Sequence, residues 1–204
     1  MKDAPLFLVL DACVLMSSIV RPLLLDLAGD GWFAPVWSAR IGEEWRRNAA
    51  RIWGRPAAEL DAEWASMCSR FAGADPGDLS AYEAGLRYSD PKDWHVIAAG
   101  LASRARAPGP ATPLVRVLTW NLKDFDRAEL RRQGLAAWDP DRQLADWLQA
   151  GPARIAPRLA GATDYARALG REEPLVDTLR RERLFRTARL MQAIGTEPAG
   201  KAGA

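Results

Sequence analysis

Residues 6–11, Leu6-Phe7-Leu8-Val9-Leu10-Asp11, decide the fold class of this 204-residue chain. Five consecutive apolar residues without polar alternation are typical of a strand buried on both faces of a parallel sheet. A second such run covers residues 114–120 (LVRVLTW), a strand fragment follows near 135–138, and helical segments separate the three. Strands alternating with helices predict an α/β protein, a three-layer α/β/α fold around a central parallel sheet.

Apolar periodicity and helix-capping residues predict the helices between these strands. The second of them begins at Ser38, a plausible N-cap, and ends before Gly54. The expected helices cover residues 13–28 (interrupted by Pro22), 38–53, 57–71, 93–104, 127–133 and 141–149, with loops over 72–80 and 105–113. Gly151-Pro152 marks a boundary, so we expect a main domain over residues 1–150 and a small C-terminal helical extension over 151–204.

Composition excludes several classes of protein. Apolar residues make up 49% and charged residues 26% of the chain, which is globular rather than disordered or fibrous usage. One His and two distant cysteines, Cys13 and Cys68, leave no zinc finger and no disulfide framework, so any metal is expected to be held by oxygen atoms. No apolar run is long enough for an export signal or a membrane span, and we expect a cytoplasmic protein.

Motifs for several common chemistries are missing. The chain has no GxxxxGK[ST] phosphate loop, and Gly29 and Gly31 lack the third glycine of a dinucleotide-binding fingerprint. A nucleophile–His site would depend on His95, the only imidazole, and no GxSxG elbow accompanies it. Carboxylates are therefore the main candidates for a functional site.

Two of these carboxylates lie in the first part of the chain. Asp11 follows the first predicted strand, where open α/β sheets place their ligands, although Asp is also a good helix N-cap. Glu44 borders the predicted apolar stripe of its helix, formed by Ile41, Trp45, Ala49 and Ile52, and can reach a crevice while that helix stays docked. The alternative for Glu44 is an ion pair with Arg47 on the solvent side.

The other candidates flank a predicted buried helix and follow the second strand. Asp90 is the better placed of two acids to cap the apolar helix that begins near residue 93, which leaves Asp93 as the site candidate. Asn121, Asp124 and Asp126 follow the second strand, where turn formation alone also favours Asn and Asp. If these acids converge, their repulsion demands a cation or raised pKa values, and oxygen ligands select Mg²⁺ or Mn²⁺.

The segments that carry these acids resemble the four motifs of PIN-domain ribonucleases, in the same order and over about residues 5–150. The motifs are Val9-Leu10-Asp11-Ala12-Cys13-Val14-Leu15, residues 37–48 (WSARIGEEWRRN), residues 90–99 (DPKDWHVIAA) and residues 119–125 (TWNLKDF). The resemblance implies Asp11, Glu44, Asp93 and Asp124 as the catalytic acids. It implies Asp11, Asp93 and Glu44 as metal ligands, and Asn121, Thr119 and Asp90 in support.

The implied activity is Mg²⁺- or Mn²⁺-dependent hydrolysis of RNA phosphodiester bonds by an endoribonuclease. The extension over 151–204 is similar to that of a VapC-like subgroup of toxins from type II toxin–antitoxin modules, which implies a cognate antitoxin protein and a possible homodimer. Asn121 stands where many relatives carry an acid, so we expect one tightly held metal ion and a second only with substrate. Arg47 and Arg51 are candidates for RNA binding.

Two other functions stay open at this point. One is a PIN-type nuclease that acts on DNA or processes RNA outside a toxin module. The other is a non-catalytic PIN module that binds nucleic acid without cutting it.

Overall fold

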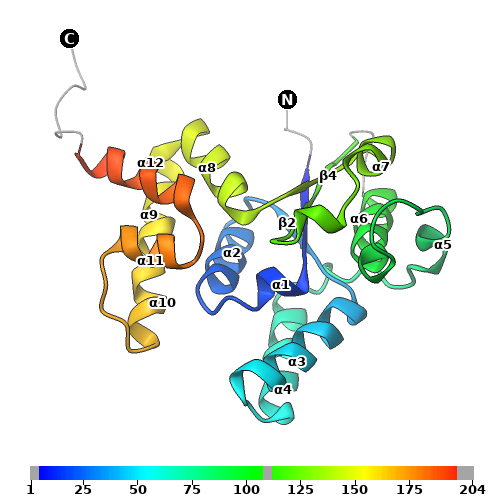
Figure 1. Cartoon of the computed structure of the whole chain (residues 1–204), viewed down its shortest axis with the longest axis horizontal. Helices are drawn as coiled ribbons and strands as arrows, with labels where there is room; N and C mark the ends of the chain where they lie inside the picture. Colours follow the sequence, from blue (N-terminus) through cyan, green and yellow to red (C-terminus); the bar gives the residue numbers. More distant parts are fainter. Residues whose placement is uncertain (1–4, 108–111, 197–204) are drawn as a thin grey trace. The chain divides into compact units, whose positions relative to one another are not determined.

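A four-stranded, all-parallel sheet forms the centre of the fold in the computed structural model, which describes residues 5–107 and 112–196 (Figure 1). Its strands are β1 (Leu6–Leu10), β2 (Ala34–Val36), β3 (Leu114–Leu118) and β4 (Leu135–Trp138), in the spatial order β2-β1-β3-β4. Helices flank the sheet, and further helices follow it in the chain. The fold class predicted from the sequence, α/β with a central parallel sheet and C-terminal helices, is confirmed.

Helices and short 3-10 turns connect the strands. In chain order they are α1 (Ala12–Leu15), α2 (Val20–Gly29), α3 (Ala39–Trp53), α4 (Ala57–Arg70), α5 (Ser80–Glu83), η1 (Pro91–Asp93), α6 (Trp94–Arg106), η2 (Leu122–Asp124) and α7 (Arg127–Arg132). The C-terminal helices are α8 (Pro140–Ala150), α9 (Pro152–Ala160), α10 (Ala162–Ala168), α11 (Leu175–Arg181) and α12 (Phe185–Thr196).

Some expected boundaries are wrong. The single helix expected over residues 13–28 is in fact two helices, α1 and α2. Pro22 lies in the first turn of α2, where the backbone N–H groups have no partner within the helix, so the N–H that proline lacks is not needed. The strand expected over 114–120 ends at Leu118, and β2 was not predicted because it has only three residues, one of them Pro35. Part of the proline-rich loop expected over 105–113, residues 108–111, lies outside the described residues.

The chain divides into two compact units. The first comprises residues 1–17 and 24–139 and contains the sheet, and the second comprises residues 18–23 and 140–204. The sequence analysis placed its domain boundary at residue 150. Within the second unit, the buried carboxylate of Asp141 accepts hydrogen bonds from the backbone N–H groups of Arg186 (2.8 Å) and Thr187 (2.9 Å), which ties the start of α8 to the start of α12.

In the first unit, α6 packs directly against the sheet. All six residues from His95 to Gly100 are buried, as expected for a helix that is apolar on every side. A Cβ atom on Gly100 would lie 3.0 to 3.2 Å from side-chain atoms of Leu135, Val9 and Val115. A larger residue at this position would therefore push the helix away from the sheet.

The strand order creates a switch point between β1 and β3. The chain leaving β1 goes to β2 on one side of the sheet, and the chain leaving β3 goes to β4 on the other. In open α/β sheets, ligands bind at the carboxyl ends of the two strands where the connections diverge in this way. Asp11 and Thr119 are the residues that directly follow these two strands.

No helix in the described part of the chain is long and apolar enough to cross a membrane.

Candidate functional site

Asp11 is held between the ends of β1 and β3. It is only 3% exposed, and its Oδ2 atom accepts hydrogen bonds from the Thr119 hydroxyl at 2.6 Å and from the Cys13 thiol at 3.1 Å. Although Asp11 occupies the N-cap position of α1, its side chain makes no capping hydrogen bond. The carboxylate is therefore oriented by tertiary contacts, and within the described residues its Oδ1 atom makes no hydrogen bond.

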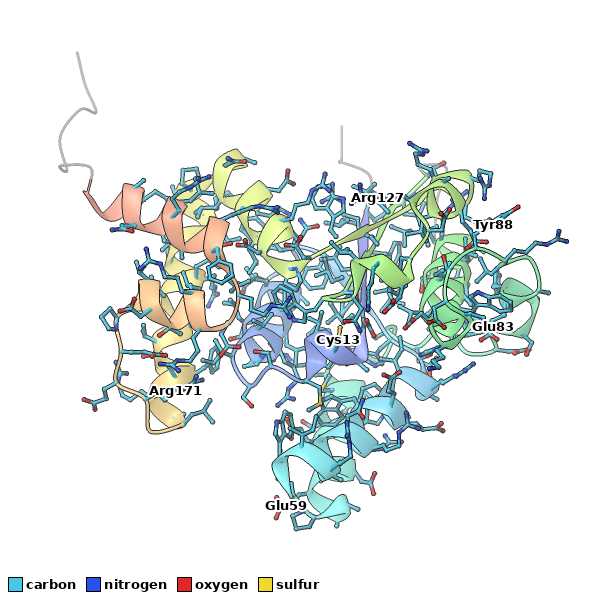
Figure 2. The ribbon with its side chains drawn as sticks, in the orientation of Figure 1. Cys13, Glu59, Glu83, Tyr88, Arg127 and Arg171 are labelled. Atoms are coloured by element: carbon cyan, nitrogen blue, oxygen red, sulfur yellow. The ribbon has the colours of Figure 1, made fainter. Side chains whose placement is uncertain are left out.

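Thr119 and Cys13 join the turn after β3 to the start of α1. Thr119 is fully buried, and its hydroxyl also accepts a hydrogen bond from the backbone N–H of Asn121 (2.9 Å). The Cys13 sulfur accepts a hydrogen bond from the N–H of Trp120 (3.3 Å), and Figure 2 labels Cys13 on α1. Burial, together with the negative charge of Asp11, raises the pKa of the Cys13 thiol to about 12. At neutral pH the thiol is therefore protonated and can act as a donor.

Glu44 reaches the same region from α3. Ser38 caps this helix by accepting a hydrogen bond from the N–H of Ile41, and the Trp45 indole donates to the carbonyl of Leu15 at 3.0 Å, so α3 is fastened to α1. The Glu44 side chain is 33% exposed, as expected for the border of the apolar stripe. The end of that stripe differs from the prediction, because Ile52 is 60% exposed and only the earlier positions are buried.

Asp90 and Asp93 differ in what their side chains bind, although Asp90 caps the short turn η1 and not the apolar helix α6. Asp90 caps η1, since its Oδ1 atom accepts a hydrogen bond from the N–H of Lys92 at 2.9 Å. Asp93 stands at the N-cap position of α6, but its partly buried side chain makes no capping hydrogen bond. The carboxylate of Asp93 is thus available to a ligand.

The turn that carries Asp124 is joined to the turn that carries Asp90. The backbone N–H of Asp90 donates to the carbonyl of Asp124 at 2.8 Å, and the N–H of Asp124 donates to the carbonyl of Asn121 at 3.0 Å. Asp126 caps α7, since its Oδ1 atom accepts a hydrogen bond from the N–H of Glu129 at 2.7 Å. The side chain of Asn121 is exposed and makes no capping hydrogen bond.

Glu129 is a buried carboxylate of this region that the sequence analysis did not identify. It is 3% exposed and accepts hydrogen bonds from the backbone N–H groups of Arg87 (2.7 Å), Tyr88 (3.2 Å) and Ser89 (2.9 Å). Burial alone raises its pKa, but these hydrogen bonds outweigh burial and hold the pKa of Glu129 below its usual value. In the sequence, the Asp126-x-x-Glu129 spacing indicates a capping box at the start of a helix. It gives no sign that Glu129 accepts hydrogen bonds from the loop over residues 87–89.

The acids of these four segments influence one another electrostatically. Burial raises the pKa of Asp93 to about 7, and the negative charges of Asp11, Asp124, Asp90 and Glu44 add to the effect, in that order. Burial and the charge of Asp11 likewise raise the pKa of Glu44, against the opposing effect of Arg47 and Arg40. The charges of Asp11, Asp124, Asp90 and Glu44 therefore all act on Asp93, which begins α6.

His95 lies beside Glu44 at the edge of this acid cluster, which we define as Asp11, Glu44, Asp93 and Asp124. Its side chain is 2% exposed, and its Nε2 atom is 3.8 Å from Oε2 of Glu44. Burial lowers the pKa of His95, as does the positive charge of Arg40, so the imidazole is neutral at pH 7. From the sequence, His95 was a candidate only for a nucleophilic site.

The donor chemistry of the acid cluster fits a hard divalent cation, but the side chains are not arranged for coordination. Across residues 5–107 and 112–196, no three His, Cys, Asp or Glu side chains are positioned to hold one metal ion. Carboxylates that carry no capping hydrogen bond, such as those of Asp93 and Asp11, can turn toward an ion. Carboxylate oxygens are ligands that suit Mg²⁺ and Mn²⁺.

The two arginines proposed for RNA binding, Arg47 and Arg51, are exposed on α3. Neither forms an ion pair with any residue that the structure describes, so the expected alternative, a Glu44–Arg47 ion pair, is not formed.

Comparison of the chain with protein-family models, with curated proteins and with solved structures gives no match. The chemistry of the site therefore rests on the residues and contacts described above.

Proposed function

We propose that this chain is a divalent-metal-dependent endoribonuclease of the PIN type, with Asp11, Glu44, Asp93 and Asp124 around Mg²⁺ or Mn²⁺. The observation that carries the proposal is electrostatic: burial, followed by the negative charges of Asp11, Asp124, Asp90 and Glu44, raises the pKa of Asp93 to about 7. Carboxylates crowded at a sheet's ligand edge are destabilising unless a cation or protons neutralise them. A divalent cation at this position is also what phosphodiester hydrolysis uses.

Each acid has a role that follows from its surroundings. Asp11 offers Oδ1 as a ligand because Thr119 and Cys13 occupy Oδ2, and Asp93 offers a carboxylate that makes no capping bond. Glu44 is a third exposed, so water can reach its carboxylate, which would position a water for attack on the phosphate. A bound Mg²⁺ or Mn²⁺ would supply Lewis-acid stabilisation of the developing negative charge.

Exposed cations next to the acid-bearing turns support a polyanionic substrate. In the first unit, several arginines elsewhere are ion-paired: Arg40 with Glu83, Arg46 with Asp61, Arg55 with Glu59 and Glu63, and Arg70 with Asp26. By contrast, four exposed cations within three residues of Asp90 or Asp124 in the sequence form no ion pair within the described residues: Arg87, Lys92, Lys123 and Arg127. Unpaired Lys and Arg side chains are what neutralise nucleic-acid phosphates.

An exposed aromatic ring accompanies these cations. Tyr88 is 69% exposed, and the guanidinium of Arg132 lies 5.3 Å from its ring centre. Figure 2 labels Tyr88 and Arg127, which belong to the loop before η1 and to α7. An exposed tyrosine ring beside an arginine is suited to stacking an unpaired base, which favours single-stranded RNA.

Cleavage assays with single-stranded and structured RNA, in Mg²⁺, Mn²⁺ or EDTA, test the proposed activity. We expect cleavage that EDTA abolishes, and its loss in Asp11→Asn and Asp93→Asn. Glu43→Gln, a change of the exposed neighbour of Glu44, is the matched control for Glu44→Gln and should leave cleavage unchanged. Full activity of Asp11→Asn or Asp93→Asn would overturn the proposal.

The biological role that we propose is that of the toxin of a type II module, neutralised by an antitoxin protein. This part of the proposal rests on the resemblance of the motifs and of the helices after residue 151. Induced expression of this protein should arrest growth. Co-expression of a small protein encoded by a neighbouring gene should relieve the arrest. Metal-dependent cleavage without growth arrest would favour an RNA- or DNA-processing nuclease, whereas binding that EDTA leaves unchanged, without cleavage, would favour a non-catalytic module.

A further inference from the structure

His95 is a buried side chain whose ring nitrogens make no hydrogen bond of normal geometry with any described residue. It is 2% exposed, and its hydrogen bond with the backbone of Lys92, which raises its pKa, lies outside that geometry. Buried polar side-chain atoms in folded proteins are nearly always hydrogen-bonded, and an exception calls for a bound water, an ion or a functional explanation.

The polar group opposite His95 is the carboxylate of Glu44. The Nε2 and Oε2 atoms are 3.8 Å apart, which is too long for a hydrogen bond. Two ligand atoms that each lie about 2.1 Å from one ion can be up to about 4.2 Å apart, so the observed separation leaves room for a shared cation. Glu44 is also a third exposed, and its side chain can adjust.

The pair is continuous with the acid cluster. Glu44 extends from α3, His95 from the first turn of α6, and Asp93 immediately precedes the same turn. The negative charge of Asp11 affects both Glu44 and His95. A nitrogen donor is thus aimed at one edge of a site otherwise made of carboxylate oxygens.

We propose that His95 is a nitrogen ligand of the metal site, sharing a divalent cation with Glu44 and favouring Mn²⁺ over Mg²⁺. This inference rests on the proposed function to the extent that the acid cluster must bind a divalent ion. It replaces the expectation from the sequence that oxygen atoms alone hold the metal. Neutral imidazole suits first-row transition metals, whereas Mg²⁺ prefers carboxylates, carbonyl groups and water.

Pulsed electron paramagnetic resonance of the full chain with Mn²⁺ alone gives a direct test. A nitrogen nucleus bonded to Mn²⁺ modulates the electron spin echo of the ion. We therefore expect ¹⁴N modulation of this echo in the unaltered protein. Labelling its single histidine with ¹⁵N should replace that pattern by the ¹⁵N one. This measurement needs no substitution and does not depend on catalysis.

Calorimetric titration of His95→Gln with Mn²⁺ and Mg²⁺ provides the second measurement. We expect the Mn²⁺ affinity to fall at least about tenfold, as for other losses around metal sites, while the Mg²⁺ affinity changes less than about twofold. Circular dichroism and the thermal midpoint of the variant check its fold. Equal losses of affinity for both metals would mean that His95 only positions Glu44 and would contradict the inference.

The possible failures are distinguishable. Mn²⁺ that binds without any histidine nitrogen modulation would overturn the role of His95 and leave the proposed nuclease standing. A chain that binds neither Mn²⁺ nor Mg²⁺ would overturn both proposals.

Discussion

The Thr119 hydroxyl lies 2.6 Å from Oδ2 of Asp11 and joins the residues that directly follow β3 and β1. The same carboxylate oxygen accepts a hydrogen bond from the Cys13 thiol, so two donors occupy one oxygen of the Asp11 carboxylate. The two strands are neighbours in the sheet, with Leu10 paired with Leu118 just before the junction. Their register therefore sets the orientation of Asp11 and directs its second oxygen away from Thr119.

Removing the hydroxyl of Thr119 should weaken metal binding. Thr119→Val keeps the shape of the side chain but loses the donor to Asp11, and partners that orient metal ligands are worth about 10- to 100-fold in metal affinity or activity. Calorimetry with Mg²⁺ and the RNA cleavage rate measure the loss. Thr119→Ser retains the hydroxyl and should stay near the original values, and equal effects of the two substitutions would argue against orientation of Asp11.

The pH dependence of stability should report the raised pKa of Asp93. An unfolded Asp has a pKa of about 3.9, whereas that of Asp93 in the folded protein is about 7. Between these values the folded state binds the proton more tightly, so the contribution of Asp93 to stability falls as the pH rises from about 4 to about 7. Without divalent metal, Asp93→Asn should therefore gain in melting temperature over the unaltered protein as pH increases.

Divalent metal should reverse this loss. Because the ion binds the ionised carboxylates, the increase in melting temperature on adding Mg²⁺ should be larger at pH 8 than at pH 5. Differential scanning calorimetry at several pH values measures both effects. An Asp93→Asn variant whose melting temperature follows that of the unaltered protein at every pH would refute the repulsion inferred for the acid cluster.

Loss of the Glu129 carboxylate should destabilise the loop that precedes η1. Glu129→Ala leaves the N–H groups of Arg87, Tyr88 and Ser89 without their acceptor, and an unsatisfied buried polar group costs about 1–3 kcal/mol. Urea unfolding at pH 7 measures the loss in the free energy of unfolding. Glu43→Ala, at an exposed position of α3, is the control and should change this energy by less than about 0.5 kcal/mol.

Introducing an acid at position 121 should create a second tight metal site. The Asn121 side chain is exposed and carries no charge, whereas its backbone N–H is already engaged with Thr119. Calorimetric titration of the unaltered protein with Mn²⁺ should give one tight site, and Asn121→Asp should add a second. Two equally tight sites in the unaltered protein would contradict this account of Asn121.

The ring of Tyr88 should contribute to RNA binding. In the Asp11→Asn background, which prevents cleavage, Tyr88→Ala should weaken binding of a single-stranded oligonucleotide by about 1–3 kcal/mol, roughly 5- to 150-fold. Fluorescence anisotropy measures the affinity. Tyr88→Phe keeps the stacking face and should bind nearly as well, so a strong loss in Tyr88→Phe would indicate a role for the hydroxyl group instead.

Local sequence signals predicted most of the secondary structure but not the tertiary use of individual side chains. Ser38 and Gly54 bound α3 as expected because capping depends on a few adjacent residues. By contrast, β2 has only three residues, too few to show an apolar pattern. Ile52 follows the apolar period of α3, yet its side chain is 60% exposed. Glu129 has the spacing of a capping residue, yet its hydrogen bonds reach a loop about 40 residues away in sequence.

The sequence by itself determined the parallel α/β fold class, because buried strands and amphipathic helices have different apolar periods that local composition reveals. It also identified which acids follow a strand or begin a helix. Only the tertiary structure decided that Asp126 caps a helix and that Asp11, although it occupies an N-cap position, makes no capping hydrogen bond. Hydrogen bonding and electrostatic repulsion depend on distances across the fold, and the pairing of β1 with β3 sets those distances.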